Sequence, residues 1–183
     1  MTETNELAAP GSFAFTPANL ELAQNEVGKY PPGRQASAVL PLLYIAQKQN
    51  EGWLPQAALD YIADFLEMPR IKVYEVATFY TMFKLKPIGR HNLQVCTNLP
   101  CWLRGSDEIL AACQRKLGVG VGETTEDGMF TVSEAECLGA CVNAPMAQIG
   151  DDYYEDLTPE SMERIIDALA RGETPPAGSQ IGR

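Results

Sequence analysis

Two stretches of the chain decide its fold and its chemistry, and each contains a pair of cysteines. Residues 95–109 have the sequence VCTNLPCWLRGSDEI, and residues 136–160 have the sequence ECLGACVNAPMAQIGDDYYEDLTPE. Each pair follows a predicted strand, so both pairs can project from the same end of one sheet. The spacings are C-x4-C and C-x3-C, and the four residues are Cys96, Cys101, Cys137 and Cys141.

The spacing of the four cysteines bears on what they would hold. A site with four thiolates suits zinc or an iron–sulfur cluster. Structural zinc usually takes tight C-x2-C pairs, whereas wider pairs suit two irons that are each held by two thiolates. Gly139 and Ala140 are small enough for backbone N–H groups to approach the cluster sulfurs. The spacing therefore favours a [2Fe–2S] cluster and leaves zinc and reduced structural or redox thiols as alternatives.

The other candidate motifs have simpler interpretations. Cys113 lies on the apolar face of a predicted helix, which is typical of a small core residue. The glycines within 118–122 follow a helix, so they lack the strand–turn–helix context of a dinucleotide-binding loop. His91 is the single histidine and has no histidine partner for catalysis. The acidic turn at 151–156 lacks the spacing of an EF-hand loop, and we predict no catalytic residue in this chain.

Composition and charge exclude several classes of protein. The 183 residues are 45% hydrophobic and 21% charged, which is an ordinary globular composition. The formal charge of −10 argues against a broad basic face that binds nucleic acid or anionic lipid. No apolar run approaches the ~20 residues that span a bilayer, so direct membrane insertion is not expected. Residues 1–10 contain two glutamates and no basic residue, unlike a secretory signal or a transit peptide.

The chain is expected to divide near residue 88, where Pro87 and Gly89 are typical of a linker. Residues 1–88 carry 9 acidic and 7 basic side chains. Residues 89–183 carry 15 acidic and 7 basic side chains and all five cysteines. We therefore predict an N-terminal helical domain over 1–88 and a cysteine-containing domain over 89–183, which ends in a tail.

The first part has the apolar periodicity of four helices. Thr16 and Pro17 start the first of them with a capping hydroxyl and a proline in the first turn. The last helix is apolar on most of its circumference near residues 79–83, a pattern that fits deep burial and an interface equally well. The predicted helices run from 17 to about 28, from about 37 to 49, from 55 to 68, and over 73–83.

The second part alternates between strands and helices, which suggests a small α/β sandwich. Gly150 to Asp152 separate two short apolar runs and indicate a hairpin. Residues from Pro175 onward are expected to form a loose tail. The predicted elements are strands at 91–95, from 130, at 147–149 and at 153–154, and helices at 106–116 and from 159.

Together with VYEVATFYTMF (73–83), the two cysteine stretches resemble the family of E subunits of NADH:quinone oxidoreductase, respiratory complex I. The resemblance runs from about residue 17 to 171, and related subunits occur in NAD-reducing hydrogenases and NAD-dependent formate dehydrogenases. It implies an α+β protein with an N-terminal helical bundle followed by a thioredoxin-like α/β ferredoxin domain. It also implies one [2Fe–2S] cluster with the ligands Cys96, Cys101, Cys137 and Cys141.

The same resemblance implies an electron-transfer subunit that works close to the FMN of a partner. FMN and NADH are expected on that partner subunit and not on this chain, and a neighbouring iron–sulfur subunit is a further possible partner. The implied location is the peripheral arm on the cytoplasmic face of a bacterial inner membrane. The alternatives are the equivalent subunit of a hydrogenase or formate dehydrogenase, or a mainly structural subunit whose cluster is a folding staple. Thioredoxin-like folds often have a cis proline where Pro145 stands, but the general preference of X–Pro bonds favours trans.

Overall fold

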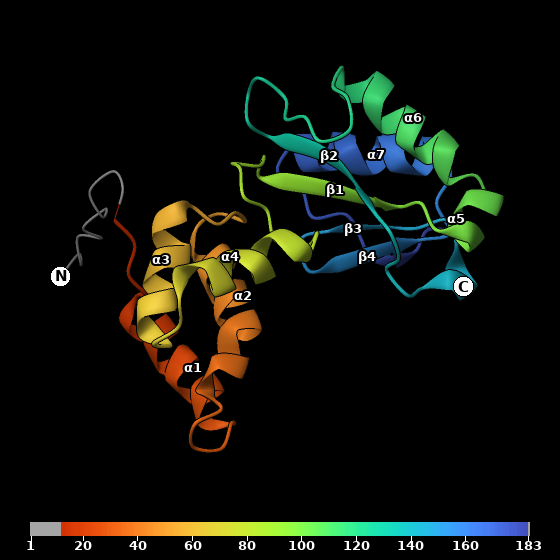
Figure 1. The fold of residues 1–183 in the computed structure, drawn as a ribbon. Coiled ribbons are helices and arrows are strands. Elements are labelled where there is room, and N and C mark those ends of the chain that lie inside the picture. Colours follow the sequence, from red (N-terminus) through yellow and green to blue (C-terminus); the bar gives the residue numbers. More distant parts are fainter. Residues whose placement is uncertain (1–11, 183) are drawn as a thin grey trace. The chain divides into compact units, whose positions relative to one another are not determined.

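A computed structural model describes residues 12–182, and the chain divides into two compact units (Figure 1). One unit ends at Pro87 and the other begins at Ile88. Across residues 12–182, every helix is too short or too polar to cross a membrane. The helices of the first unit precede the strands of the second, so the predicted α+β class is confirmed.

Over residues 12–87, the first unit is a bundle of four α-helices with an apolar core. Thr16 accepts a hydrogen bond from the Asn19 backbone N–H at 3.3 Å and so caps the first helix as predicted. The second helix is preceded by a turn of 3₁₀ helix at Gln35–Ala38. The helices are α1 (Pro17–Gly28), α2 (Val39–Gln49), α3 (Gln56–Phe65) and α4 (Arg70–Phe79). Leu42, Leu43, Leu54, Ile62 and Val73 are fully buried between them.

Helix α4 ends at Phe79, so the predicted continuation to residue 83 is wrong. The following segment makes hydrogen bonds to other parts of the bundle instead of continuing the helix. Gln47 donates to the Met82 carbonyl at 3.1 Å and accepts from the Lys84 N–H at 2.8 Å. The Leu54 N–H donates to the Lys84 carbonyl at 2.7 Å. These bonds fix a turn over residues 81–83, and they compete with the helical bonds that the sequence pattern alone would favour.

The second unit has a five-stranded sheet in the order β2-β1-β3-β4-β5. Strands β1 and β2 are parallel, β3 is antiparallel to both of its neighbours, and β4 and β5 are parallel. The predicted hairpin is confirmed. The strands are β1 (His91–Cys96), β2 (Phe130–Ala135), β3 (Ala147–Ile149), β4 (Asp152–Glu155) and β5 (Gly178–Ser179).

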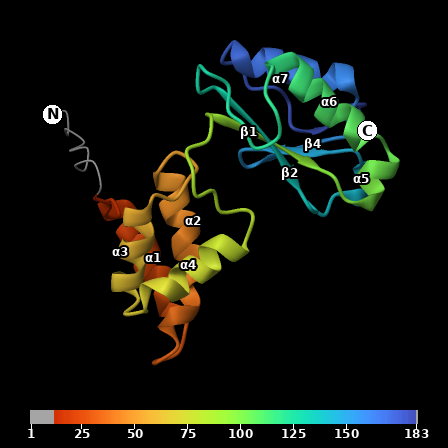
Figure 2. The same cartoon turned by 45° about the horizontal axis from the view of Figure 1, so that its top comes forward.

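Two long helices of this unit lie side by side over one face of the sheet (Figures 1 and 2). They are α6 (Ser106–Leu117) and α7 (Pro159–Ala170), and both begin where the sequence predicts. Lys116 of α6 forms an ion pair with Asp167 of α7 at 2.7 Å. The core between the helices and the sheet contains Leu93, Val95, Ile109, Val132, Met162 and Ile166, all of which are buried.

The C-terminal segment is an edge strand, so the predicted loose tail is wrong. Strand β5 pairs with β4, with Gly178 beside Tyr154. The Gln180 N–H then donates to the Glu155 carbonyl at 2.9 Å. Two paired residues are too few to give a periodic signal, and their order depends on a strand that lies far away in the sequence.

Candidate metal centre

The two cysteine pairs lie at the same end of the sheet because β1 and β2 are parallel. Cys96 is the last residue of β1, and its register partner on β2 is Ala135, two residues before Cys137. Cys101 lies in α5 (Leu99–Leu103), a short helix that the sequence analysis missed. Cys141 begins a 3₁₀ turn, Cys141–Asn143. The ends of β1 and β2 therefore bring both cysteine loops to the same end of the sheet, as the sequence predicts.

The two cysteine pairs differ in burial. Cys96 and Cys101 are buried, whereas Cys137 and Cys141 are exposed. Burial raises the pKa of the Cys101 thiol to about 11, with further increases from the hydrogen-bonded Cys96 and from Cys141. Within residues 12–182, histidine, cysteine and carboxylate side chains do not gather in threes as a closed metal site would require.

Hydrogen bonds link the two cysteine loops directly. Asn98 donates from Nδ2 to the Glu136 carbonyl at 2.7 Å, and its Oδ1 accepts from the Leu99 N–H at 2.8 Å. The Thr97 N–H also donates to the Ala135 carbonyl at 3.1 Å. Asn98 thus caps α5 and holds the loop that leads to Cys137. Sequence reasoning missed this residue, although Asn followed by Leu-Pro is a helix-start signal.

The loop between Cys137 and Cys141 is supported from the hairpin. Gly139 has a φ of +83°, a left-handed conformation that favours glycine. The Tyr153 hydroxyl of β4 donates to the Leu138 carbonyl at 2.8 Å. An exposed loop with a fixed backbone can present its sulfurs to a metal group without rearranging a packed core.

The residues present fit a cluster with soft ligands. Four thiols lie on two loops that hydrogen bonds link to each other. Thiolates select iron–sulfur clusters or zinc over metals that prefer oxygen. The two buried thiols are next to the Ala144 and Met146 side chains, which form a small apolar cluster with them. Such a surround limits access of water to a metal group, and this tunes its potential.

The remaining predicted positions lie outside this group. Cys113 is fully buried in the core of the second unit, and burial raises the pKa of its thiol to about 12, which confirms it as a core residue. Gly118 ends α6 with a φ of +70°, which confirms its role as a helix terminator. The His91 ring packs on the Phe130 ring at 5.5 Å, and burial lowers the His91 pKa. The peptide bond before Pro145 is cis, so the expected trans isomer is wrong.

Comparisons with known proteins bear on most of the chain. A family model described as "Thioredoxin-like [2Fe-2S] ferredoxin" matches residues 23–170. The chain is 60% identical over 158 residues to the E subunit of the NADH-quinone oxidoreductase of Rickettsia bellii, covering 86% of this chain and 95% of that protein. It is 61% identical over 158 residues to the protein of the same name from Rickettsia conorii, with the same two coverages.

One similar solved structure is the crystal structure of an NAD+-reducing [NiFe]-hydrogenase in the air-oxidized state. The TM-score is 0.62 at 20% sequence identity. The match covers 71% of this chain and 23% of that chain, so this chain spans less than a quarter of the hydrogenase chain. At this identity the likeness concerns the fold alone.

Proposed function

Because the chain belongs to the thioredoxin-like [2Fe–2S] ferredoxin family, we propose that it is the electron-transfer subunit of an NADH–quinone oxidoreductase and holds one [2Fe–2S] cluster. The observation that carries the proposal is the 60% identity to the Rickettsia bellii protein across 95% of its length. The two thiol loops, which hydrogen bonds link to each other, support the proposal independently. The proposed ligands are Cys96, Cys101, Cys137 and Cys141.

The chain's own residues would bind and shield the group. The parallel strands set the two loops side by side, and Asn98 ties them together. When bound, a [2Fe–2S] cluster takes up and returns one electron at a time. Burial of Cys96 and Cys101 would keep water from one side, whereas the exposed Cys137 and Cys141 leave the other side open toward a partner.

A one-electron carrier needs a partner that handles the hydride of NADH, and we propose the FMN- and NADH-binding subunit of the same complex. Exposed apolar side chains beside the thiol loops support a docking surface there. The Trp102 indole N–H donates to Asp107 at 2.9 Å, which fixes a large ring that is 54% exposed. Such rings anchor interfaces. The other exposed apolar residues on the two loops are Leu99, Leu103 and Val142.

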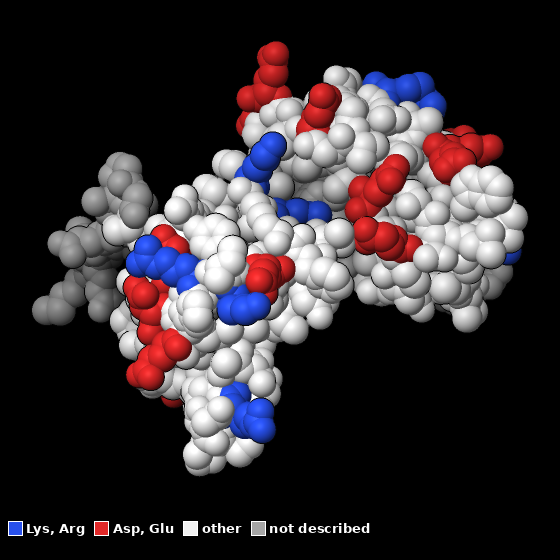
Figure 3. All heavy atoms as spheres, in the orientation of Figure 1, with Lys and Arg blue, Asp and Glu red and all other residues white. Residues whose placement is uncertain are grey.

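Charge supports an association with a protein surface as well. The second unit carries most of the chain's acidic excess, and its visible face shows separate acidic groups with uncharged surface between them (Figure 3). An acidic excess on this unit fits a partner surface that carries basic residues at its rim.

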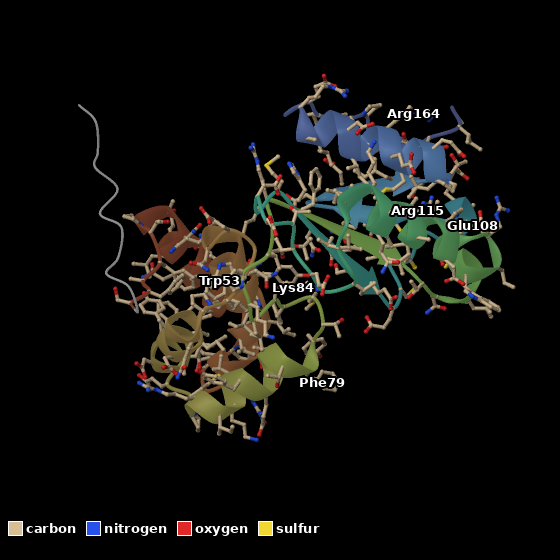
Figure 4. The ribbon with its side chains drawn as sticks, turned by 90° about the horizontal axis from the view of Figure 1, so that it is seen from above. Trp53, Phe79, Lys84, Glu108, Arg115 and Arg164 are labelled. Atoms are coloured by element: carbon tan, nitrogen blue, oxygen red, sulfur yellow. The ribbon has the colours of Figure 1, made fainter. Side chains whose placement is uncertain are left out.

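The helical bundle offers a second contact for partners. Phe79, at the end of α4, is 76% exposed and meets Tyr80 edge-on at 5.0 Å (Figure 4). Phe83, by contrast, is buried. The apolar residues that the sequence predicts on one helix therefore divide into exposed ones, such as Phe79, and buried ones, such as Phe83. We propose that residues 1–88 form a helical domain that grips the partner and that residues 89–183 form the cluster domain. The assembled position would be the peripheral arm on the cytoplasmic face of a bacterial inner membrane, with a neighbouring iron–sulfur subunit within reach.

The test uses the assembled complex and a matched pair of cysteine variants. Complex that contains the parent chain or Cys113→Ser should show the EPR signal of this cluster after NADH is added under anaerobic conditions. Complex with Cys141→Ser should assemble but show that signal altered or lost. An unchanged signal in Cys141→Ser, or its loss in Cys113→Ser with the protein folded, would contradict the proposal.

A further inference from the structure

The end of strand β4 lies between the Cys141 turn and the C-terminal strand. Asp156, the first residue after β4, is 5% exposed and has a φ of +52°. A buried carboxylate on a left-handed backbone position is costly unless surrounding groups hold it there. The groups that hold Asp156 come from both neighbours of this segment.

On one side, Asp156 holds the turn that contains Cys141. The Asn143 side chain donates from Nδ2 to Asp156 Oδ2 at 2.9 Å, and the Asp156 N–H donates to the Asn143 carbonyl at 2.7 Å. The Asn143 N–H in turn donates to the Ala140 carbonyl at 3.1 Å. Two bonds therefore attach Asp156 to a short turn that begins at an exposed proposed ligand.

On the other side, the C-terminal strand holds Asp156. The Ser179 hydroxyl donates to the same Oδ2 at 2.7 Å. The strand itself is fixed by the Gln180 N–H bond to the Glu155 carbonyl and by the pairing of Gly178 with Tyr154. Asp156 Oδ2 is a carboxylate oxygen. The hydrogen bonds that it accepts from Ser179 and Asn143 are therefore stronger than bonds between neutral groups.

We propose that the C-terminal strand β5 is a lock, meaning a support that keeps the second thiol loop (residues 137–141) in place. It acts through Asp156, which is a positioning residue. This inference rests on the proposed function in one respect, namely that Cys141 is a cluster ligand. The hydrogen bonds that Asp156 accepts from Ser179 and from Asn143 set how firmly the Cys141 turn is held. Loosening it lets this turn open and releases iron, while Cys96 and Cys101 stay buried on their own strand and helix.

The first experiment compares two deletions in the full chain purified with its cluster. A chain that ends at Pro176 lacks β5, whereas a control that ends at Gln180 keeps Ser179 and both β5 contacts. Loss of a supporting partner commonly weakens metal binding by about 10–100-fold, so the shorter chain should release iron to a chelator roughly 10-fold faster. The control should match the full chain. Equal rates in the short and full chains, or a control as fast as the short chain, would overturn the proposal.

The second experiment exchanges the two side chains. Asn143→Asp puts two carboxylates where a donor met an acceptor, so it should speed iron release roughly as much as the deletion does. The double variant Asn143→Asp with Asp156→Asn restores one donor and one acceptor and keeps the net charge. It should return iron release and the EPR line shape toward those of the parent. A double variant that releases iron as fast as Asn143→Asp would refute the lock.

A third measurement separates this inference from the proposed function. Hydrogen exchange on the cluster-free chain should show residues 136–145 exchanging faster in the short chain and in Asn143→Asp, with the α6 and β1 amides unchanged. A parent chain that never binds iron would contradict the proposed function. Unchanged hydrogen exchange over 136–145 in the short chain and in Asn143→Asp would contradict the lock.

Discussion

Cys113 should behave as a chemically inert thiol, and its reactivity tests the separation of four site cysteines from one core cysteine. Burial raises the pKa of its thiol from 9.0 to about 12. At pH 8 the thiolate fraction of Cys113 is then lower by roughly 1,000-fold than that of an unperturbed thiol, since each pKa unit is a factor of ten. Alkylation proceeds through the thiolate, so iodoacetamide should modify Cys113 more slowly by about the same factor.

The assay uses the folded chain without its cluster, with Cys137 as the exposed internal reference. Peptide mass spectrometry at timed intervals gives the rate at each cysteine, and a urea-denatured sample should show similar rates at both. Cys113→Ala should still bind a full complement of iron. Modification of Cys113 within about tenfold of the Cys137 rate would show that burial does not suppress the Cys113 thiolate.

Three further substitutions test the fold and the docking surface. Leu93→Ala empties a fully buried position in the second unit and should lower the free energy of unfolding in urea by about 2–5 kcal/mol, and a loss well below this range would contradict the core. In Gly89→Ala the new Cβ would lie 2.7 Å from the Phe130 carbonyl carbon, so thermal unfolding should show a loss of about 1–3 kcal/mol. An unchanged melting temperature would speak against that close approach. Trp102→Ala should weaken binding of the flavin subunit by roughly 2 kcal/mol in calorimetry while the cluster signal stays, and equal affinity would remove Trp102 from the interface.

Much of the fold is encoded in local signals that survive in the structure. Thr16 and Thr158 cap helices where a hydroxyl precedes a proline, and the turn at Gly150 joins two paired strands. Helix α5 was missed because its five residues are too few for a periodic pattern. The end of α4 depends on Gln47, which lies more than thirty residues away, and no local pattern records such a bond.

The sequence predicts where the two cysteine pairs lie in the fold, and the structure confirms that place, whereas the role of the four thiols as ligands stays a prediction. Cysteine spacing after two strands is a local signal, and parallel pairing of those strands brings the loops to one end. The supports of the loops were not predictable, because Asn98, Tyr153 and Asp156 act through contacts to distant backbone and side-chain atoms. The sequence also does not distinguish the buried pair of thiols from the exposed pair.

The most direct measurement is the metal content of the full chain purified under anaerobic conditions. Iron, acid-labile sulfide and zinc would be counted per chain, with an EPR spectrum after one-electron reduction. We expect two irons and two sulfides per chain and one paramagnetic species, as a [2Fe–2S] cluster requires. Zinc in place of iron, or fewer than two irons in intact chain, would contradict the proposed cluster.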